Sequence, residues 1–226
     1  TLTLRSVDTS GNLNTANYVI QNGVINFSTD DLWSITTLGG GSLTVSAQLT
    51  GTGTLRKFGS GNLNLTNDLN DFTGDLNTNN GRTVTVTSIK NDGVASAAGA
   101  GGTVAVQNNS VLTYTGAGDS TNRIFQFGNG QTTLNSSGSG ALIWTGTINN
   151  TSTLATKILN LGGTNADANE IQGVLADNTG LLRVDKEGSG NWILSGANTY
   201  TGATNVNNGT LQIGNGGTTG SLATDS

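Results

Sequence analysis

A strand-and-turn unit occurs twice in this chain, and this recurrence constrains the fold more than any other feature. The clearer copy runs from Asp185 to Ile213 as DKEGSGNWILSGANTYTGATNVNNGTLQI. Its opening, KEGSGNWIL from Lys186, matches KFGSGNLNL from Lys57, 129 positions earlier. The one-residue slips between the copies fall in turns, where insertions cost little. Strand-turn-strand units that recur with variable spacing predict a β-solenoid better than a closed barrel.

Turn residues align between the two copies, which we place at about 54–86 and 183–213. The sequence NDFTG at 70–74 matches NTYTG at 198–202, and NNG at 79–81 matches NNG at 207–209. Glycine and asparagine tolerate the left-handed backbone of tight turns. The glycines that define these turns are Gly59, Gly61, Gly74, Gly81, Gly188, Gly190, Gly202 and Gly209.

The second copy resembles a known family, the autotransporter-associated β-strand repeat, also called the passenger-associated transport repeat. The first copy departs from the family pattern at Leu63 and Phe72, which replace the tryptophan and the tyrosine, and at Arg82, which interrupts the Gly-Thr step. The resemblance implies an all-β, right-handed parallel β-helix from a secreted or surface-displayed Gram-negative protein, anchored in the outer membrane through a region outside this chain. It implies nothing about catalysis.

Composition agrees with a thin core made of many short strands. Only 10% of the 226 residues are charged, 35 are glycine and none is proline, which a long internal ladder tolerates poorly. An antiparallel sandwich would show similar turn spacing, and the repeat favours the solenoid. At about 22 residues a rung, the chain makes roughly ten rungs. We expect 1–226 to be a single β-helical segment of a longer exported protein.

The residue inventory excludes several functional classes. Cysteine and histidine are absent, which removes thiolate sites and the commonest base and metal ligand. A net charge of −5 argues against nucleic acid, and no apolar run is long enough to insert in a membrane. We expect no cofactor, no metal and no catalytic residue. The acidic clusters are Asp30–Asp31, Asp68/Asp71/Asp75, Asp167/Glu170 and Asp185/Glu187, which we interpret as solvated turns, with calcium at 167–170 as the lesser alternative.

Two further features leave alternatives open. Aromatic side chains in strands usually pack across the ladder, but an outward row would stack on sugars. The candidates for glycan stacking are Trp33, Trp144, Trp192 and Tyr200. The small-residue segment 93–102 is either a flexible loop or a tightly packed corner, and we favour the loop.

The function that these patterns favour is an extracellular structural or display rod, acting as an adhesin stalk or fibre component without catalysis. Its partners would be other segments of the parent chain, or identical subunits stacked end to end through open β-helix ends. A glycan-binding adhesive module and a self-assembling filament subunit are the alternatives. A carbohydrate-active enzyme would require a groove with two carboxylates near an arginine or lysine.

Overall fold

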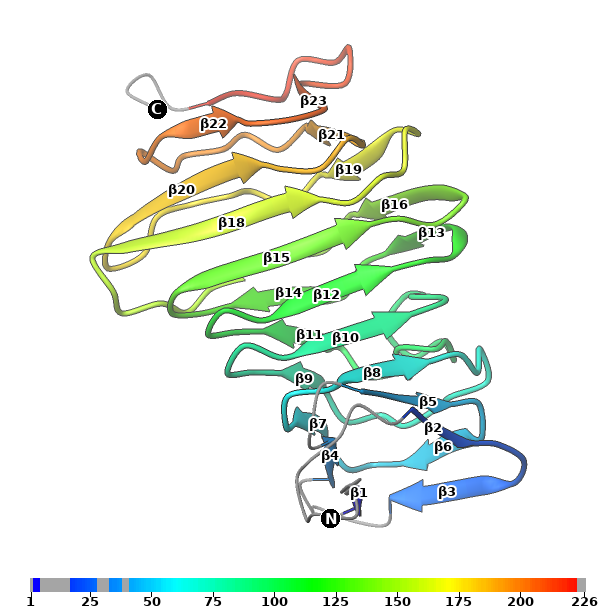
Figure 1. The fold of residues 1–226 in the computed structure, drawn as a ribbon. Helices are drawn as coiled ribbons and strands as arrows, with labels where there is room; N and C mark the ends of the chain where they lie inside the picture. Colours follow the sequence, from blue (N-terminus) through cyan, green and yellow to red (C-terminus); the bar gives the residue numbers. More distant parts are fainter. Residues whose placement is uncertain (1, 5–16, 28–32, 38–40, 223–226) are drawn as a thin grey trace.

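The computed structural model describes residues 2–4, 17–27, 33–37 and 41–222. In this part of the chain all regular structure is β-strand, and every pair of neighbouring strands is parallel (Figure 1). None of the residues described there forms a helix that could cross a membrane. The expected all-β class is confirmed.

The strands form three stacked sheets and one short pair. Sheet 1 contains β2 (Tyr18–Ile20), β5 (Ser42–Val45), β8 (Asn62–Leu65), β10 (Thr83–Val86), β12 (Val111–Tyr114), β15 (Gln131–Ser136), β18 (Thr156–Gly162), β20 (Leu181–Lys186) and β22 (Thr204–Val206). Sheet 2 contains β1 (Leu2–Leu4), β4 (Trp33–Thr37), β7 (Leu55–Phe58), β9 (Leu76–Thr78), β11 (Thr103–Val106), β14 (Ile124–Phe127) and β17 (Ile148–Asn150). Sheet 3 contains β13 (Ala117–Thr121), β16 (Gly140–Trp144), β19 (Asn169–Ile171), β21 (Asn191–Leu194) and β23 (Thr210–Ile213). The pair is β3 (Val24–Phe27) with β6 (Gln48–Gly51).

Successive strands of sheet 1 come from successive turns of the chain, which we call coils (Figure 1). Leu63 pairs with Val84, 21 positions on, whereas Val84 pairs with Leu112, 28 positions on. The nine strands of sheet 1 therefore delimit about eight coils, which rise by about 38 Å in total. The predicted parallel β-helix of roughly ten rungs is confirmed, and the coils are fewer because several corners carry extra residues.

The core is a set of columns in which each coil contributes one side chain. The register of sheet 1 stacks one such column, and its members are at most 1% exposed. They are Leu43, Leu63, Val84, Leu112, Leu134 and Leu161. Each coil buries its apolar side chains only against its neighbours, so stability is a sum of nearest-neighbour contacts.

The two repeat copies occupy different faces of the solenoid. In the first copy, β7 lies in sheet 2 and β8 in sheet 1, so Lys57 sits at the corner between these two sheets. In the second copy, β20 lies in sheet 1 and β21 in sheet 3, so Lys186 sits at the next corner around the coil. The repeat therefore forms a corner between two consecutive strands. It can occur at more than one corner of the solenoid.

The segment 93–102 is mostly a packed corner, so the preference for a loop was wrong. Residues 96–101 are buried, although 91–94 are exposed. Gly99 has φ +80°, and a Cβ added there would lie 2.4 Å from Cζ of Phe72. The corner is also held by Arg123, whose Nη1 donates to the carbonyl oxygen of Ala98 at 3.0 Å. Only small side chains fit between these neighbours.

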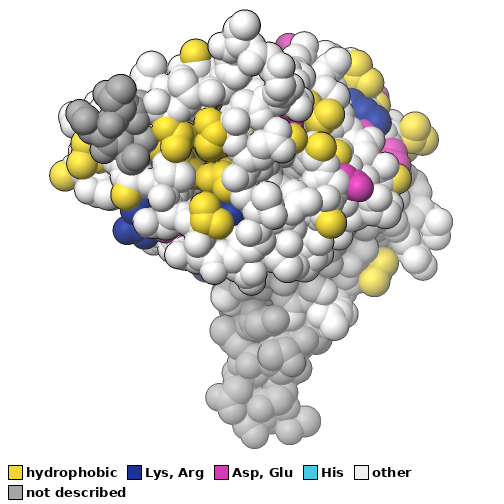
Figure 2. Space-filling view, turned by 90° about the horizontal axis from the view of Figure 1, so that it is seen from above, with side chains coloured by type: hydrophobic (Ala, Val, Ile, Leu, Met, Phe, Trp, Pro, Cys, Tyr) yellow, Lys and Arg dark blue, Asp and Glu magenta, His cyan; other side chains and the backbone are white. Residues whose placement is uncertain are grey.

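Seen along its axis from the C-terminal end, the solenoid carries few charged groups (Figure 2). Most of this surface is backbone and uncharged polar side chains, and apolar side chains gather near its middle. Val206 and Ile213, from the last two strands, are 56% and 38% exposed. This end of the solenoid is therefore mostly polar without being charged, in agreement with the low share of charged residues in the chain.

Candidate functional site

The lysine of each repeat copy is buried, and its ammonium group is held by the turn that follows it. Lys186 Nζ donates to the carbonyl oxygens of Glu187 at 2.5 Å and Gly188 at 2.8 Å. Lys57 Nζ donates in the same way to the carbonyl oxygens of Phe58 and Gly59. Both lysines are at most 1% exposed. Charge-assisted hydrogen bonds to carbonyls thus replace the carboxylate partner that a buried lysine usually needs.

The second lysine also joins two coils. Lys186 Nζ donates to the carbonyl oxygen of Asn208 at 3.1 Å, in the Asn-Asn-Gly turn of the next coil. A Cβ added at Gly209 would lie 2.7 Å from that nitrogen. The two turns of the repeat therefore stack on each other, with the ammonium group between them. Sequence reasoning placed the lysine before a turn but gave it no role.

The turn glycines serve two different needs. Gly59, Gly81, Gly188 and Gly209 have φ between 65° and 77°, which side chains disfavour. Gly74 and Gly202 instead lie against the previous coil, where an added Cβ would be 2.2 Å from Gly53 O and 2.3 Å from Leu182 O.

Burial, and to a smaller extent the nearby positive charge of Arg82, together lower the pKa of Lys57 to about 8. Burial also lowers the pKa of Lys186. The negative charge of the Glu187 carboxylate partly opposes this shift. The folded chain therefore releases these protons at a lower pH than the unfolded chain does. This difference couples protonation of the lysine corners to folding.

Between pH 8 and pH 10 we expect the protein to gain stability as the pH rises. In this window the unfolded chain binds the Lys57 proton and the folded chain has lost it, so the free energy of unfolding rises by up to about 1.4 kcal/mol per pH unit. The raised pKa of the buried Tyr114 opposes this gain at higher pH. Urea midpoints at pH 7.5, 8.5 and 9.5 measure the slope. Lys57→Met should reduce the slope, to which Lys186 also contributes. The surface variant Lys90→Arg keeps the ion pair with Asp119 and should leave the slope unchanged, whereas a midpoint that falls across this window contradicts the assignment.

Buried asparagines provide a second link between coils. Asn70 Oδ1 accepts from Leu49 N at 2.8 Å in the coil before, and its Nδ2 donates to Ala97 O at 3.0 Å in the coil after. Asn169 also connects three coils, through Leu142 N at 2.9 Å and Asn191 O at 2.8 Å. We interpreted Asn70 only as a turn residue, although its recurrence two positions before an aromatic in both copies was a signal.

Three of the four candidate stacking aromatics are in the core. Trp144, Trp192 and Tyr200 are 0% exposed, and the indole nitrogen of Trp192 donates to Gly162 O at 2.9 Å. Stacking on a sugar requires an exposed ring face, which these three residues lack, so the stacking interpretation is corrected to core packing. Trp33 begins β4, and its side chain lies outside the described residues.

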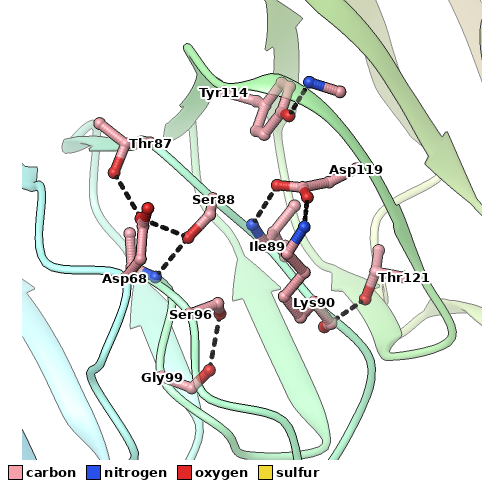
Figure 3. Close-up of polar contacts among 12 residues, drawn as sticks. Asp68, Thr87, Ser88, Ile89, Lys90, Ser96, Gly99, Tyr114, Asp119 and Thr121 are labelled. Carbon is pink, nitrogen blue, oxygen red and sulfur yellow. Dashed lines mark hydrogen bonds and ion pairs between the residues drawn. The ribbon is translucent and has the colours of Figure 1, made fainter.

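A polar corner follows β10, where two carboxylates from different coils lie near a lysine (Figure 3). Asp68 accepts from the hydroxyl of Ser88 at 2.7 Å and that of Thr87 at 3.1 Å. Asp119 accepts from the backbone N–H of Ile89 at 2.9 Å and forms an ion pair with Lys90. The hollow beside them measures about 200 Å³. These contacts hold residues 87–90 in place after β10. The corner therefore positions the packed segment that follows.

Other carboxylates differ from the solvated turns that we expected. Asp185 is 4% exposed and pairs with Arg183 at 2.7 Å, and Glu170 is 5% exposed. Both side chains point outward from their sheets, and neighbouring side chains cover them. Asp30–Asp31 lie outside the described residues, and the residues that are described contain no group of three histidines, cysteines or carboxylates able to hold a metal.

Comparison with known proteins places the lysine corners in a known repeat. The family model described as Passenger-associated-transport-repeat matches residues 55–87 and 184–213, the two segments that begin at these corners. The chain carries autotransporter passenger repeats. Over 149 residues, 63% of its length, it is 42% identical to the adhesin BmaC autotransporter of Brucella suis biovar 1 (strain 1330). The match spans 4% of that adhesin, and no solved structure matches the chain. In this chain, each copy of the repeat thus contains a buried lysine turn, a buried asparagine turn and a positive-φ glycine turn.

Proposed function

We propose that this chain is a rigid display segment of an adhesin-type autotransporter passenger, exposed at the bacterial surface and acting as a stalk without catalysis. The 42% identity to part of an adhesin autotransporter is the observation that carries the proposal. The fold suits the role, because similar parallel pairings repeat from coil to coil and length can grow without a new core. In the parent protein, the stalk would hold adhesive regions away from the membrane.

The polar corner is the arrangement nearest to an enzyme site among the described residues, and its chemistry favours a structural role. Both carboxylates already accept hydrogen bonds from the segment 87–90. The chain has no histidine or cysteine to act as base or nucleophile. Asp119→Asn is therefore expected to loosen the packed corner without removing an activity.

A deletion that respects the register tests the stalk role in the parent protein. Removing residues 63–83 takes out one coil, because Leu63 and Val84 occupy equivalent positions in sheet 1. We expect the shortened parent to reach the cell surface and to support adhesion at wild-type levels. Removing only residues 63–73 takes out about half a coil, misaligns every later column and should abolish surface display.

The readouts are surface immunolabelling and counts of bacteria bound to host cells. Loss of adhesion after the whole-coil deletion, with normal surface labelling, would mean that this segment contacts the target directly. The stalk proposal would then give way to an adhesive module.

A further inference from the structure

A longitudinal groove runs along the corner between sheet 3 and sheet 2. One hollow of about 450 Å³ is lined by residues of 145–148 and 172–176. A second, of about 330 Å³, is lined by residues of 170–172, 195–197 and 215–219. The two hollows share Gln172 and so adjoin each other, and together they extend across four levels of the solenoid. At about 4.8 Å per level the groove is about 14 Å long, which suits a short linear oligomer better than a single small molecule.

Stacked glycines explain why the groove exists at this corner. A Cβ added at Gly173 would lie 2.4 Å from the carbonyl oxygen of Gly146, and one at Gly196 would lie 2.6 Å from that of Gly173. Each glycine therefore leaves no room for a side chain against the coil before it. Three successive coils therefore have glycine at this corner, where only backbone is present. The side chains on either side form the walls of the groove.

One end of the groove contains a buried carboxylate that forms no ion pair with a lysine or arginine in the part of the chain that the structure describes. Glu170 is 5% exposed, and its oxygens accept from Ser195 Oγ at 2.5 Å, Gln172 Nε2 at 3.1 Å and Asn215 Nδ2 at 3.3 Å. No lysine or arginine lines either hollow. A buried carboxylate that only neutral donors solvate favours a ligand that brings further donors or positive charge.

The same hydrogen bonds determine which groups remain for a ligand. The hydroxyl proton of Ser195 and one amide proton each of Gln172 and Asn215 point to Glu170, which leaves their oxygen atoms as acceptors beside one remaining N–H on each amide. The groove is thus negatively charged and rich in acceptors at this end. At the other end, Val174 is 45% exposed beside Ile148 and offers an apolar contact.

We propose that this groove binds a neutral or amino-bearing oligosaccharide along the solenoid axis and excludes acidic sugars. Sugar hydroxyls and ammonium groups would donate to the acceptors around Glu170, and the apolar face of a pyranose ring would lie on Val174. The sugar would be held by hydrogen bonds, because the buried Trp144 and Trp192 cannot stack on it. The inference rests on the proposed surface exposure and gives the display segment a ligand of its own.

Calorimetric titration of the purified chain with three tetrasaccharides tests this specificity. The probes are β-1,4-linked tetramers of glucose and of glucosamine, and an α-1,4-linked tetramer of galacturonic acid, at pH 6 and low salt. We expect the glucose tetramer to bind, the glucosamine tetramer to bind at least tenfold more tightly, and the galacturonate tetramer to show no binding.

Two variants separate the charge from the shape of the groove. Glu170→Gln keeps the volume and should reduce the preference for glucosamine over glucose to less than twofold. Val174→Arg places a long side chain at an exposed position of the groove, where folding tolerates it, and should weaken both ligands at least tenfold. Asp167→Asn is the matched control, because Asp167 is an exposed carboxylate outside both hollows, and it should bind as wild type does.

Absence of binding to the two non-acidic tetramers at millimolar concentration would overturn the proposal. So would equal binding of the galacturonate tetramer, or unchanged affinity in both groove variants. These outcomes leave the stalk role intact, because the whole-coil deletion removes residues 63–83 and does not include the groove. A failed deletion test with successful titration would instead reject the stalk and keep the glycan site.

Discussion

Replacing Trp144 with alanine is expected to destabilise the middle coils by about 3–5 kcal/mol. The side chain is 0% exposed, and its ring lies 5.0 Å from that of Phe125. Its indole nitrogen donates to the carbonyl oxygen of Arg123 at 2.7 Å. Alanine would leave a cavity and also an unpaired buried carbonyl, and both effects reduce stability.

Hydrogen exchange is the suitable measurement, because a solenoid need not unfold in a single step. Amides of β14, β16 and β19 should lose protection in Trp144→Ala, whereas those of β5 and β8 should keep it, because contacts extend only to neighbouring coils. Trp144→Phe retains most of the ring volume and should cost about 1–2 kcal/mol. Uniform loss of protection along the chain would contradict the nearest-neighbour description.

Replacing Gly74 with alanine is expected to cost about 3 kcal/mol, the upper end for overpacking. An added Cβ would lie 2.2 Å from the carbonyl oxygen of Gly53 and 2.6 Å from the amide nitrogen of Thr54. These are backbone atoms of the previous coil, so the clash can be relieved only by separating the two coils. Urea denaturation followed by circular dichroism measures the cost.

Gly217→Ala is the matched control for this substitution. No atom lies within 4 Å of a Cβ added at Gly217, so the change should stay within about 0.5 kcal/mol. If Gly74→Ala proved as mild as Gly217→Ala, the coils at Gly74 could not be stacked as closely as described.

The architecture was predictable because the same short unit recurs in the sequence. Repetition of the Gly-Ser-Gly turn after Lys57 and Lys186 indicated stacked coils, and the alternation of apolar residues indicated which strands face inward. The corner insertions such as 88–100, which lengthen single coils, were not evident from the sequence, because the spacing of turns within the repeat does not reveal them. The rotation of the second copy by one face was also not predictable, because both copies have the same local sequence.

Side-chain environments were harder to predict than the fold. Exposure of an aromatic depends on whether it faces the inside of its coil, and Trp144 faces inward beside Phe125. The burial of Lys186 depends on a turn of the next coil, which its own sequence does not specify. The groove arises from the stacking of Gly146, Gly173 and Gly196, whose spacings of 27 and 23 residues follow no fixed period.

The stacking of coils in register is the central claim, and disulfide formation between adjacent coils tests it most directly. The chain has no native cysteine, so a Thr85→Cys, Thr113→Cys variant contains one pair only. These positions pair across β10 and β12, at about 4.8 Å between Cα atoms, which a disulfide spans. The offset pair Thr83→Cys, Thr113→Cys places the Cα atoms about 8 Å apart, beyond that reach. The described register predicts rapid oxidation of the first pair and little of the second, whereas equal oxidation, or preference for the offset pair, would contradict it.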